Sequence, residues 1–237
     1  YNLMIVYFIL AILIVLISFY VHELHKFNPN AELIQIQESN KSIISEKIKE
    51  KSPLLIHNLS NKVEFTGVTI DNLVLNNPGY IIKDNNKYIS LDAFNNKEID
   101  QICVIDNERM IEDFNLKSSL KEINNLFMDT LSCNLTIKLN ILKGNHKITL
   151  QKNKHNYLLL TQLTGESTVF IVNPKHGDIL TKNYTESKKW AFKIILKKGI
   201  SLYIPPEWYY MYEVNKDSIH VSSYCDNYFT YLYNLLR

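Results

Sequence analysis

Cysteine is scarce in this chain of 237 residues, and several familiar catalytic motifs are missing. The three cysteines, Cys103, Cys133 and Cys225, are widely spaced and form no Cys-x-x-Cys pair. This spacing indicates neither a zinc site nor a disulfide framework, so we expect them to act as small buried hydrophobic residues. The chain also has no glycine-rich phosphate loop, no His-Glu-x-x-His and no Gly-x-Ser-x-Gly. The sequence therefore does not predict the phosphate, zinc-protease or hydrolase chemistry that these motifs support.

The chain also lacks a strong charge of either sign. It has 26 Lys and Arg against 24 Asp and Glu, a net charge of +2. Nucleic-acid binding usually needs a clustered basic face, so no nucleic-acid partner is predicted. One local group of lysines flanks apolar strand-like segments, which is typical of a solvated sheet edge that resists aggregation. These lysines are Lys188, Lys189, Lys193, Lys197 and Lys198.

A long apolar run, Leu3–Val21, contains no charged residue, glycine or proline. About 20 apolar residues in a helix span a bilayer core, and Tyr7 and Tyr20 stand near the ends, where aromatic rings favour the interface. A cleaved signal peptide usually has a basic start, a shorter apolar core and a small-residue cleavage site, and none of these features is visible here. We therefore predict that residues 1–26 form a single-pass membrane anchor in contact with the lipid bilayer. The flanking charges nearly cancel, so the positive-inside rule selects no orientation.

Beyond the anchor, the pattern predicts a linker over residues 27–40 and one β-rich domain over residues 41–237. Helical spacing or composition predicts helices at 42–51, 116–131 and 227–236. Many short strands separated by Asn, Asp, Gly and Pro favour a sandwich or a barrel. The expected strands are 33–36, 54–56, 63–70, 80–83, 87–91, 135–142, 147–151, 157–163, 168–172, 191–196, 201–204, 209–214 and 219–224.

The stretch Gly199–Val214, GISLYIPPEWYYMYEV, places two prolines between two β-rich runs. Proline fixes φ and removes a backbone donor, so this pair predicts a rigid corner. The stretch resembles the last metal-ligand segment of JmjC-type, cupin-like hydroxylases, in which Gly-Asp-x-Leu-Tyr-Ile-Pro leads into Pro-x-Trp-x-His. The matching residues are Gly199, Leu202, Tyr203, Ile204, Pro205 and Trp208. The family's Asp position holds Ile200, and its iron-binding His position holds Tyr210.

A second stretch, Thr149–Pro174, is similar to the segment of the same family that opens the metal site with Thr-x-x-His-x-Asp. Gln162, Gly165 and Pro174 set the register, and Thr149 agrees with it. In this register the His-x-Asp positions hold Lys152 and Lys154. Pro53, in the segment Lys51–Ile56, stands where the family has a Lys-x-Pro-hydrophobic strand. The resemblance covers about residues 33–224.

The resemblance implies a double-stranded β-helix, a jelly-roll or cupin-like barrel with flanking helices, behind one transmembrane helix. Fe(II) in this family needs two imidazoles and a carboxylate on one face, and residues i and i+2 of a strand point to one side. Lys152 and Lys154 offer ammonium groups without lone pairs, and Tyr210 replaces the last ligand. The resemblance therefore implies an inactive domain without metal or cofactor that serves as a structural or protein-interaction module.

The high content of Asn, Ile and Lys suggests an AT-rich coding genome. An anchored, degenerate hydroxylase-like domain would suit a large DNA virus that kept the scaffold of a captured enzyme. By this analogy the expected location is a virion membrane, and the expected partners are capsid or membrane proteins.

Two alternatives accompany this interpretation. Lys152 and Lys154 could bind an anionic ligand, although they could equally face solvent or meet an acidic neighbour such as Glu166 or Glu213. Unpaired buried ammonium groups would cost several kcal/mol each, so something must solvate or pair them.

The other alternative is an active Fe(II)/2-oxoglutarate hydroxylase whose ligands are His176, Asp178 and His220. His176-Gly177-Asp178 is itself a His-x-Asp sequence. It follows Pro174 closely on a predicted turn, where its side chains need not share a barrel face.

Overall fold

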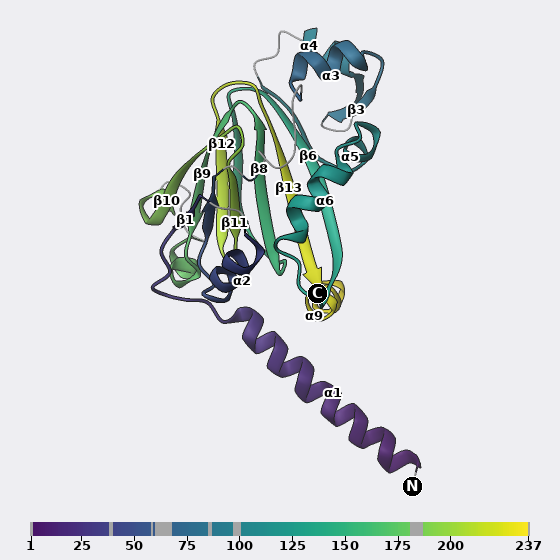
Figure 1. Ribbon diagram of the computed structural model, residues 1–237, viewed down its shortest axis with the longest axis vertical. Helices are drawn as coiled ribbons and strands as arrows, with labels where there is room; N and C mark the ends of the chain where they lie inside the picture. Colours follow the sequence, from purple (N-terminus) through teal and green to yellow (C-terminus); the bar gives the residue numbers. More distant parts are fainter. Residues whose placement is uncertain are drawn as a thin grey trace.

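The computed structural model describes residues 2–37, 40–57, 59, 68–84, 87–96, 101–180 and 187–236. Within these ranges, one long helix leads into a β-rich domain, which confirms that part of the predicted fold (Figure 1). Side chains in the domain pack into two core clusters, one between two facing sheets and one between the larger sheet and a set of helices.

The first helix, α1 (Asn2–His25), contains the predicted apolar run. Within its segment Leu3–His25 the mean hydropathy over 18 residues reaches 2.9, and the helix is long and apolar enough to cross a membrane. Its large side chains from Leu3 to Phe19 are exposed, so packing against the domain does not account for their apolar character. The helix projects from one end of the β domain (Figure 1).

Of the described strands, seven form the large sheet, in the order β1-β2-β11-β8-β13-β6-β5. Strands β1 and β2 pair in parallel, and the other neighbours pair antiparallel. Because β1 belongs to this sheet, the predicted linker over residues 27–40 already contributes to the domain. The strands are β1 (Ile34–Ile36), β2 (Leu54–Ile56), β5 (Gln101–Asn107), β6 (Ser132–Gly144), β8 (Tyr157–Thr164), β11 (Ser201–Ile204) and β13 (Ser218–Asn227).

Four other described strands form the small sheet, in the antiparallel order β10-β9-β12-β7. Edge strand β10 shows the alternation expected of a half-buried strand, with Ile194 and Leu196 buried and Lys193 and Lys197 exposed. Lys193 and Lys197 therefore lie on a solvated sheet edge, as predicted, whereas Lys188 is half-buried and forms an ion pair with Glu213. The strands are β7 (His146–Lys152), β9 (Glu166–Val172), β10 (Ala191–Lys197) and β12 (Tyr209–Val214).

The other face of the large sheet carries helices. Helix α2 (Lys41–Lys49) begins at Asn40, whose side chain accepts a hydrogen bond from the Ser42 amide, a common N-cap. Its Ile44 is fully buried in the helix-side core. The α3–α4 and β3 region lies at the end of the domain away from α1 (Figure 1). The remaining elements are α3 (Ile70–Asn76), β3 (Ile81–Asp84), β4 (Lys87–Ser90), α4 (Leu91–Asn96), α5 (Arg109–Asp113), α6 (Lys117–Asn125), η2 (Pro174–His176), α7 (Gly177–Leu180), η3 (Lys188–Trp190) and α9 (Tyr228–Leu236).

Two family-like residues have a clear folding role at the β8–β9 turn. Gln162 is fully buried, donates to Ser218 Oγ at 2.7 Å and accepts from Ser167 Oγ at 2.6 Å. Gly165 has a φ of +74°, and a Cβ there would lie 2.3 Å from the Asp217 carbonyl oxygen. Only glycine fits such a position without strain.

Two predicted elements differ from the structure, and four observed ones were not predicted. Most of the predicted strand 63–70 lies outside the described residues, and Ile70 begins helix α3 instead of ending a strand. The predicted helix 116–131 is shorter, because α6 ends at Asn125. Asp129 then forms a turn in which its carboxylate accepts from the Leu131 amide. Strand β5 and helices α3, α4 and α5 were not predicted.

Candidate functional site

The positions that resemble a metal site lie where β7 and β12 pair in the small sheet. Tyr210 pairs with Gln151 and Tyr212 with Ile148, so a β-bulge on β7 separates the two pairs. Residues directly opposite each other share a face, and Tyr210 and Tyr212 belong to the core between the sheets. Gln151 is therefore the β7 residue beside Tyr210, and the Tyr210 hydroxyl donates to Gln151 Oε1 at 2.7 Å.

A small polar cavity lies at this point between the two sheets. Across from Gln151 and Tyr210, the large sheet contributes Asn140, whose side-chain amide donates to Ser222 Oγ at 3.0 Å. The cavity measures about 20 Å³, room for about one water molecule. Small-molecule sites usually measure roughly 300–1,000 Å³, so this cavity cannot hold a co-substrate as it stands. Its lining residues are Asn140, Ile148, Gln151, Tyr210, Tyr212, Ser222 and Tyr224.

His220 lies on β13 and is 2% exposed. Its ring meets the Tyr212 ring edge-on, with centroids 4.8 Å apart. Within the described part of the chain, neither ring nitrogen has a hydrogen-bond partner. Burial lowers the pKa of His220 from 6.5 to about 4, so the imidazole is neutral at pH 7.

The side chains present do not fit an Fe(II) centre of the facial-triad kind. Among the described residues, no three His, Cys, Asp or Glu side chains lie close enough together to hold a metal ion. His176 lies in η2 and stacks on Trp190 at 4.7 Å, Asp178 is exposed in α7, and His220 is buried between the sheets. The structure therefore does not bring His176, Asp178 and His220 together as a metal-binding group.

Lys152 and Lys154 have different surroundings. Lys152 pairs with Tyr209 in the sheet, and its Nζ forms an ion pair with Glu207 and lies 5.7 Å from the Tyr209 ring centroid. Lys154 follows the strand and is exposed. The acidic neighbour of Lys152 is thus Glu207, a residue that the sequence did not suggest.

The two acidic residues that the sequence did suggest lie elsewhere. Glu213 makes ion pairs with Lys188 and, at 3.9 Å, with Lys147, while Glu166 is exposed at the start of β9.

The predicted Pro205-Pro206 corner is held by Asn153, a site residue that the sequence did not reveal. Asn153 is 1% exposed, and its side-chain amide donates to the carbonyl oxygens of Ile204 at 2.9 Å and Pro205 at 3.0 Å. Its backbone exchanges hydrogen bonds with Trp208 and Glu207, and Glu207 has a φ of +69°. An asparagine between two lysines gives no local signal of this role, because its partners lie about 50 positions away.

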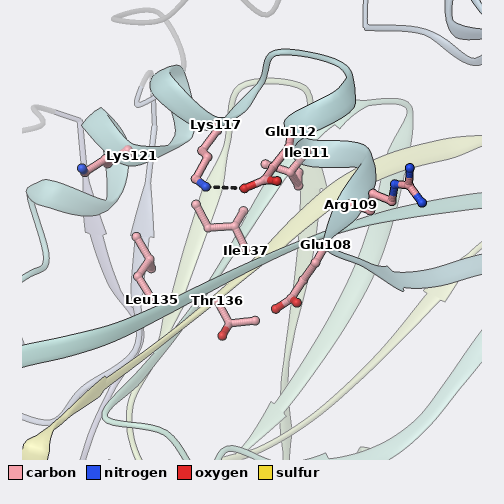
Figure 2. A pocket seen from close by; sticks show the side chains of 9 residues that line it. All are labelled: Glu108, Arg109, Ile111, Glu112, Lys117, Lys121, Leu135, Thr136 and Ile137. Atoms are coloured by element: carbon pink, nitrogen blue, oxygen red, sulfur yellow. Dashed lines mark hydrogen bonds and ion pairs between the residues drawn. The ribbon is translucent and has the colours of Figure 1, made fainter.

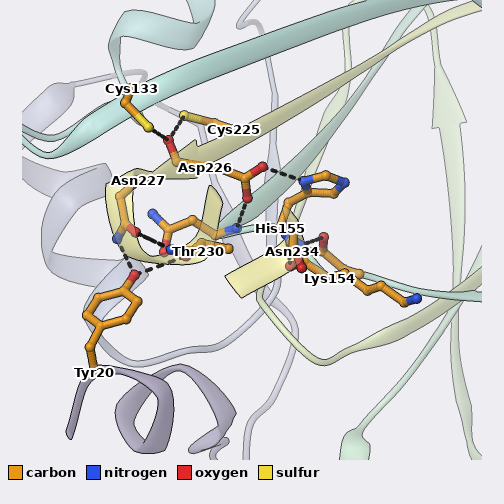
Figure 3. A network of polar contacts seen from close by, with 11 residues as sticks. Tyr20, Cys133, Lys154, His155, Cys225, Asp226, Asn227, Thr230 and Asn234 are labelled. Atoms are coloured by element: carbon orange, nitrogen blue, oxygen red, sulfur yellow. Dashed lines mark hydrogen bonds and ion pairs between the residues drawn. The ribbon is translucent and has the colours of Figure 1, made fainter. Parts of the chain in front are cut away.

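The end of α1 contacts the domain through aromatic rings and through polar groups, and Figure 3 shows the polar contacts of Tyr20. The Tyr20 ring stacks on Phe229 of α9 at 4.6 Å, and its hydroxyl hydrogen-bonds with Thr230 Oγ1 at 3.1 Å. The Asn227 side chain also donates to the Tyr20 hydroxyl. These contacts fix the side of α1 near its C-terminal end against α9.

A second set of contacts holds the last turn of α1. His25 lies 3.2 Å from both Tyr233 Oη and Glu207 Oε1, so Glu207 contacts both His25 and Lys152. Lys51 donates to the carbonyl oxygens of Lys26, at 2.7 Å, and of Glu23. The last carbonyls of a helix have no partner within the helix, so Lys51 satisfies two exposed acceptors there.

The prediction that the cysteines are buried is confirmed for one of the two cysteine side chains that the structure describes. Cys225 is fully buried, and burial raises its pKa to about 11, whereas Cys133 is exposed. Both sulfurs point toward the backbone oxygen of Asp226, whose carboxylate contacts His155 Nδ1 at 2.9 Å (Figure 3). The side chain of Cys103 lies outside the described residues.

Two larger grooves lie on the helical side of the large sheet. One measures about 600 Å³ between α5, α6 and β6, and it mixes acidic and basic side chains such as the paired Glu112 and Lys117 (Figure 2). The other measures about 830 Å³ beside α2, with Phe127, Tyr157 and Tyr203 among the residues that line it. Neither groove contains the residues that the sequence indicated as a site.

Comparison of the sequence with models of known protein families and with curated proteins gives no match. The likeness to JmjC-type and cupin-like domains therefore rests on the residues quoted from the sequence.

Proposed function

We propose that the chain is a membrane-anchored, catalytically inactive domain with a double-stranded β-helix, and that it serves as a structural or protein-interaction module. The order of the strands supports the fold. From β6 to β13, successive strands alternate between the large and the small sheet, except that β9 and β10 pair within the small sheet. This alternation is expected of a double-sheet jelly roll with its strands wound around one core.

The observation that carries the proposal of inactivity is the hydrogen bond between Tyr210 and Gln151. It occupies the place between β7 and β12 where the family resemblance puts the iron ligands. Iron with its co-substrate needs open coordination positions, and only about 20 Å³ of free space lies beside this pair. The interior in this proposal is a packed core that stabilises the shell.

The contacts at the end of α1 support an anchor that is retained after synthesis. Cleavage of α1 as a signal peptide would remove Tyr20 from Phe229, His25 from Glu207 and the helix carbonyls from Lys51. These contacts link α1 to three places in the domain: the Pro205-Pro206 corner between β11 and β12, helix α9, and the residues that follow α2. A segment destined for removal has no need of them.

The anchor is tested on the full chain with a C-terminal tag, expressed in cells that contain a secretory membrane system. We expect a protein of full-length mass that stays in the membrane fraction after alkaline carbonate extraction. A soluble product shortened by the mass of α1 would refute the anchor.

Inactivity is tested on the full chain purified in detergent micelles, loaded with Fe(II) and supplied with 2-oxoglutarate. We expect substoichiometric iron and no succinate above the protein-free control. One iron per chain together with succinate formation would overturn the proposal of an inactive domain. Crosslinking in the native membrane then tests the partner class, which we expect to be capsid or membrane proteins of a virion.

A further inference from the structure

Helix α9 presents an apolar stripe to the outside of the protein. Its sequence, YFTYLYNLL, has no charged residue. Tyr228, Tyr231, Leu232 and Leu235 are exposed by 60%, 43%, 49% and 69%. Their spacing of i, i+3, i+4 and i+7 places them on one face of the helix. An apolar helical face normally packs on a core, but this one is turned away from it.

The opposite face of α9 holds the end of α1. Phe229 and Thr230 contact Tyr20, and Tyr233 contacts His25. Tyr20 and His25 lie at the C-terminal end of the membrane-spanning candidate segment Leu3–His25. Figure 1 shows α9 at the end of the domain from which α1 departs. If α1 spans a bilayer, these contacts place α9 at the level of the membrane surface.

We infer that α9 lies in the membrane–water interface and buries its Tyr and Leu stripe among lipids, as a second membrane contact beside the anchor. This inference rests on the proposed anchoring of α1. Tyrosine rings favour the interface, and a helix with one apolar face can lie in its plane. Both helices expose apolar side chains, and α9 is held against the end of α1, so lipid is the occupant that both helices share. Because α9 carries no charge, the contact needs no anionic lipid.

The test uses tryptophan fluorescence of the full chain in phosphatidylcholine vesicles whose acyl chains are brominated, because bromine quenches tryptophan in contact with lipid. Leu232→Trp reports on the α9 stripe, and Leu13→Trp, in the middle of α1, reports on the anchor. Leu75→Trp is the matched control, because Leu75 is an equally apolar and exposed residue (79%) on α3. The unsubstituted chain gives the background from Trp190 and Trp208.

We expect Leu232→Trp and Leu13→Trp to lose a comparable share of their added fluorescence in brominated vesicles, and Leu75→Trp to lose none. Quenching of Leu13→Trp without quenching of Leu232→Trp would overturn the α9 inference and leave the anchor in place. Absence of quenching at both would overturn both proposals. A Leu232→Trp signal protected from bromine and also from aqueous acrylamide would identify a second copy of the chain as the occupant, which contradicts a lipid contact.

Discussion

Replacing His220 by leucine should make the stability of the domain less sensitive to acid. In the folded chain this imidazole is buried beside Tyr212, and within the described residues neither ring nitrogen has a hydrogen-bond partner. The protonated ring would have neither water nor a partner for its charge, which is why its pKa falls from 6.5 to about 4. In the unfolded chain the same ring takes up a proton at its ordinary pKa.

The pKa shift gives the size and the pH window of the effect. Well above pH 6.5 the His220 ring is neutral in both the folded and the unfolded chain, so its protonation takes nothing from the free energy of unfolding. As the pH falls below 6.5, the imidazole of the unfolded chain binds a proton while the buried imidazole of the folded chain stays neutral. The free energy of unfolding therefore decreases until about pH 4. Between pH 7.5 and pH 5 this linkage amounts to about 2 kcal/mol. With a urea m-value of about 2 kcal/mol/M, the midpoint should fall by about 1 M from this residue alone.

The assay is urea unfolding of the full chain in detergent micelles at pH 7.5 and pH 5, followed by the emission of the fully buried Trp208. The pKa values of His146 and His176 are also lowered by burial, so the informative quantity is the difference between chains. His220→Leu should lose less stability on acidification than the unsubstituted chain by the amount above. The control His22→Asn changes an exposed histidine and should behave like the unsubstituted chain. An equal acid-induced loss in His220→Leu would refute the reasoning.

Two further predictions concern the β8–β9 turn and the Glu207 ion pair. Gly165→Ala should lower the free energy of unfolding by at least about 2 kcal/mol, because a Cβ would meet the Asp217 carbonyl and φ is left-handed. Gly79→Ala, where a Cβ meets nothing within 4 Å, should change it little, and equal effects in urea unfolding would contradict the turn geometry. A double-mutant cycle of Lys152→Met and Glu207→Gln should give a coupling of about 1 kcal/mol that shrinks in 1 M salt. A coupling near zero at low salt would show that the pair does not stabilise the fold.

Most of the described strands were predictable because their signals are local, although β5 was missed. Strands β2, β11 and β12 begin and end at the predicted residues, since turn-forming residues and prolines bound each one. Helices α3, α4 and α5 were not predicted, because each has only five to seven residues and too few turns to show helical spacing. In α3 the only clear signal is Thr69, whose hydroxyl accepts from the Asn72 amide as an N-cap. Short helices of this kind depend on packing more than on propensity.

The candidate site was only partly predictable, because its geometry depends on pairing between distant strands. A regular strand would place Lys152 and Lys154 on one side. The bulge between the Tyr210 and Tyr212 pairs places Gln151 beside Tyr210, and Lys152 turns toward Glu207. The bulge is defined by the pairing of β7 with β12, which the β7 sequence alone does not show. The role of Asn153 was not predictable for the same reason, because its acceptors, the carbonyl oxygens of Ile204 and Pro205, are distant in the sequence.

The seam between α1 and the domain, made by Tyr20, His25 and Lys51, has a mechanical consequence for a membrane-bound chain. A transmembrane helix adjusts to bilayers of different thickness by tilting. A domain on a flexible linker would keep its orientation when the helix tilts. Here the end of the helix contacts the domain through Phe229, Glu207 and the Lys51 amine, so the two tilt together. A thinner bilayer would therefore lean the whole β domain over and change how far its α3–α4 end stands above the lipid.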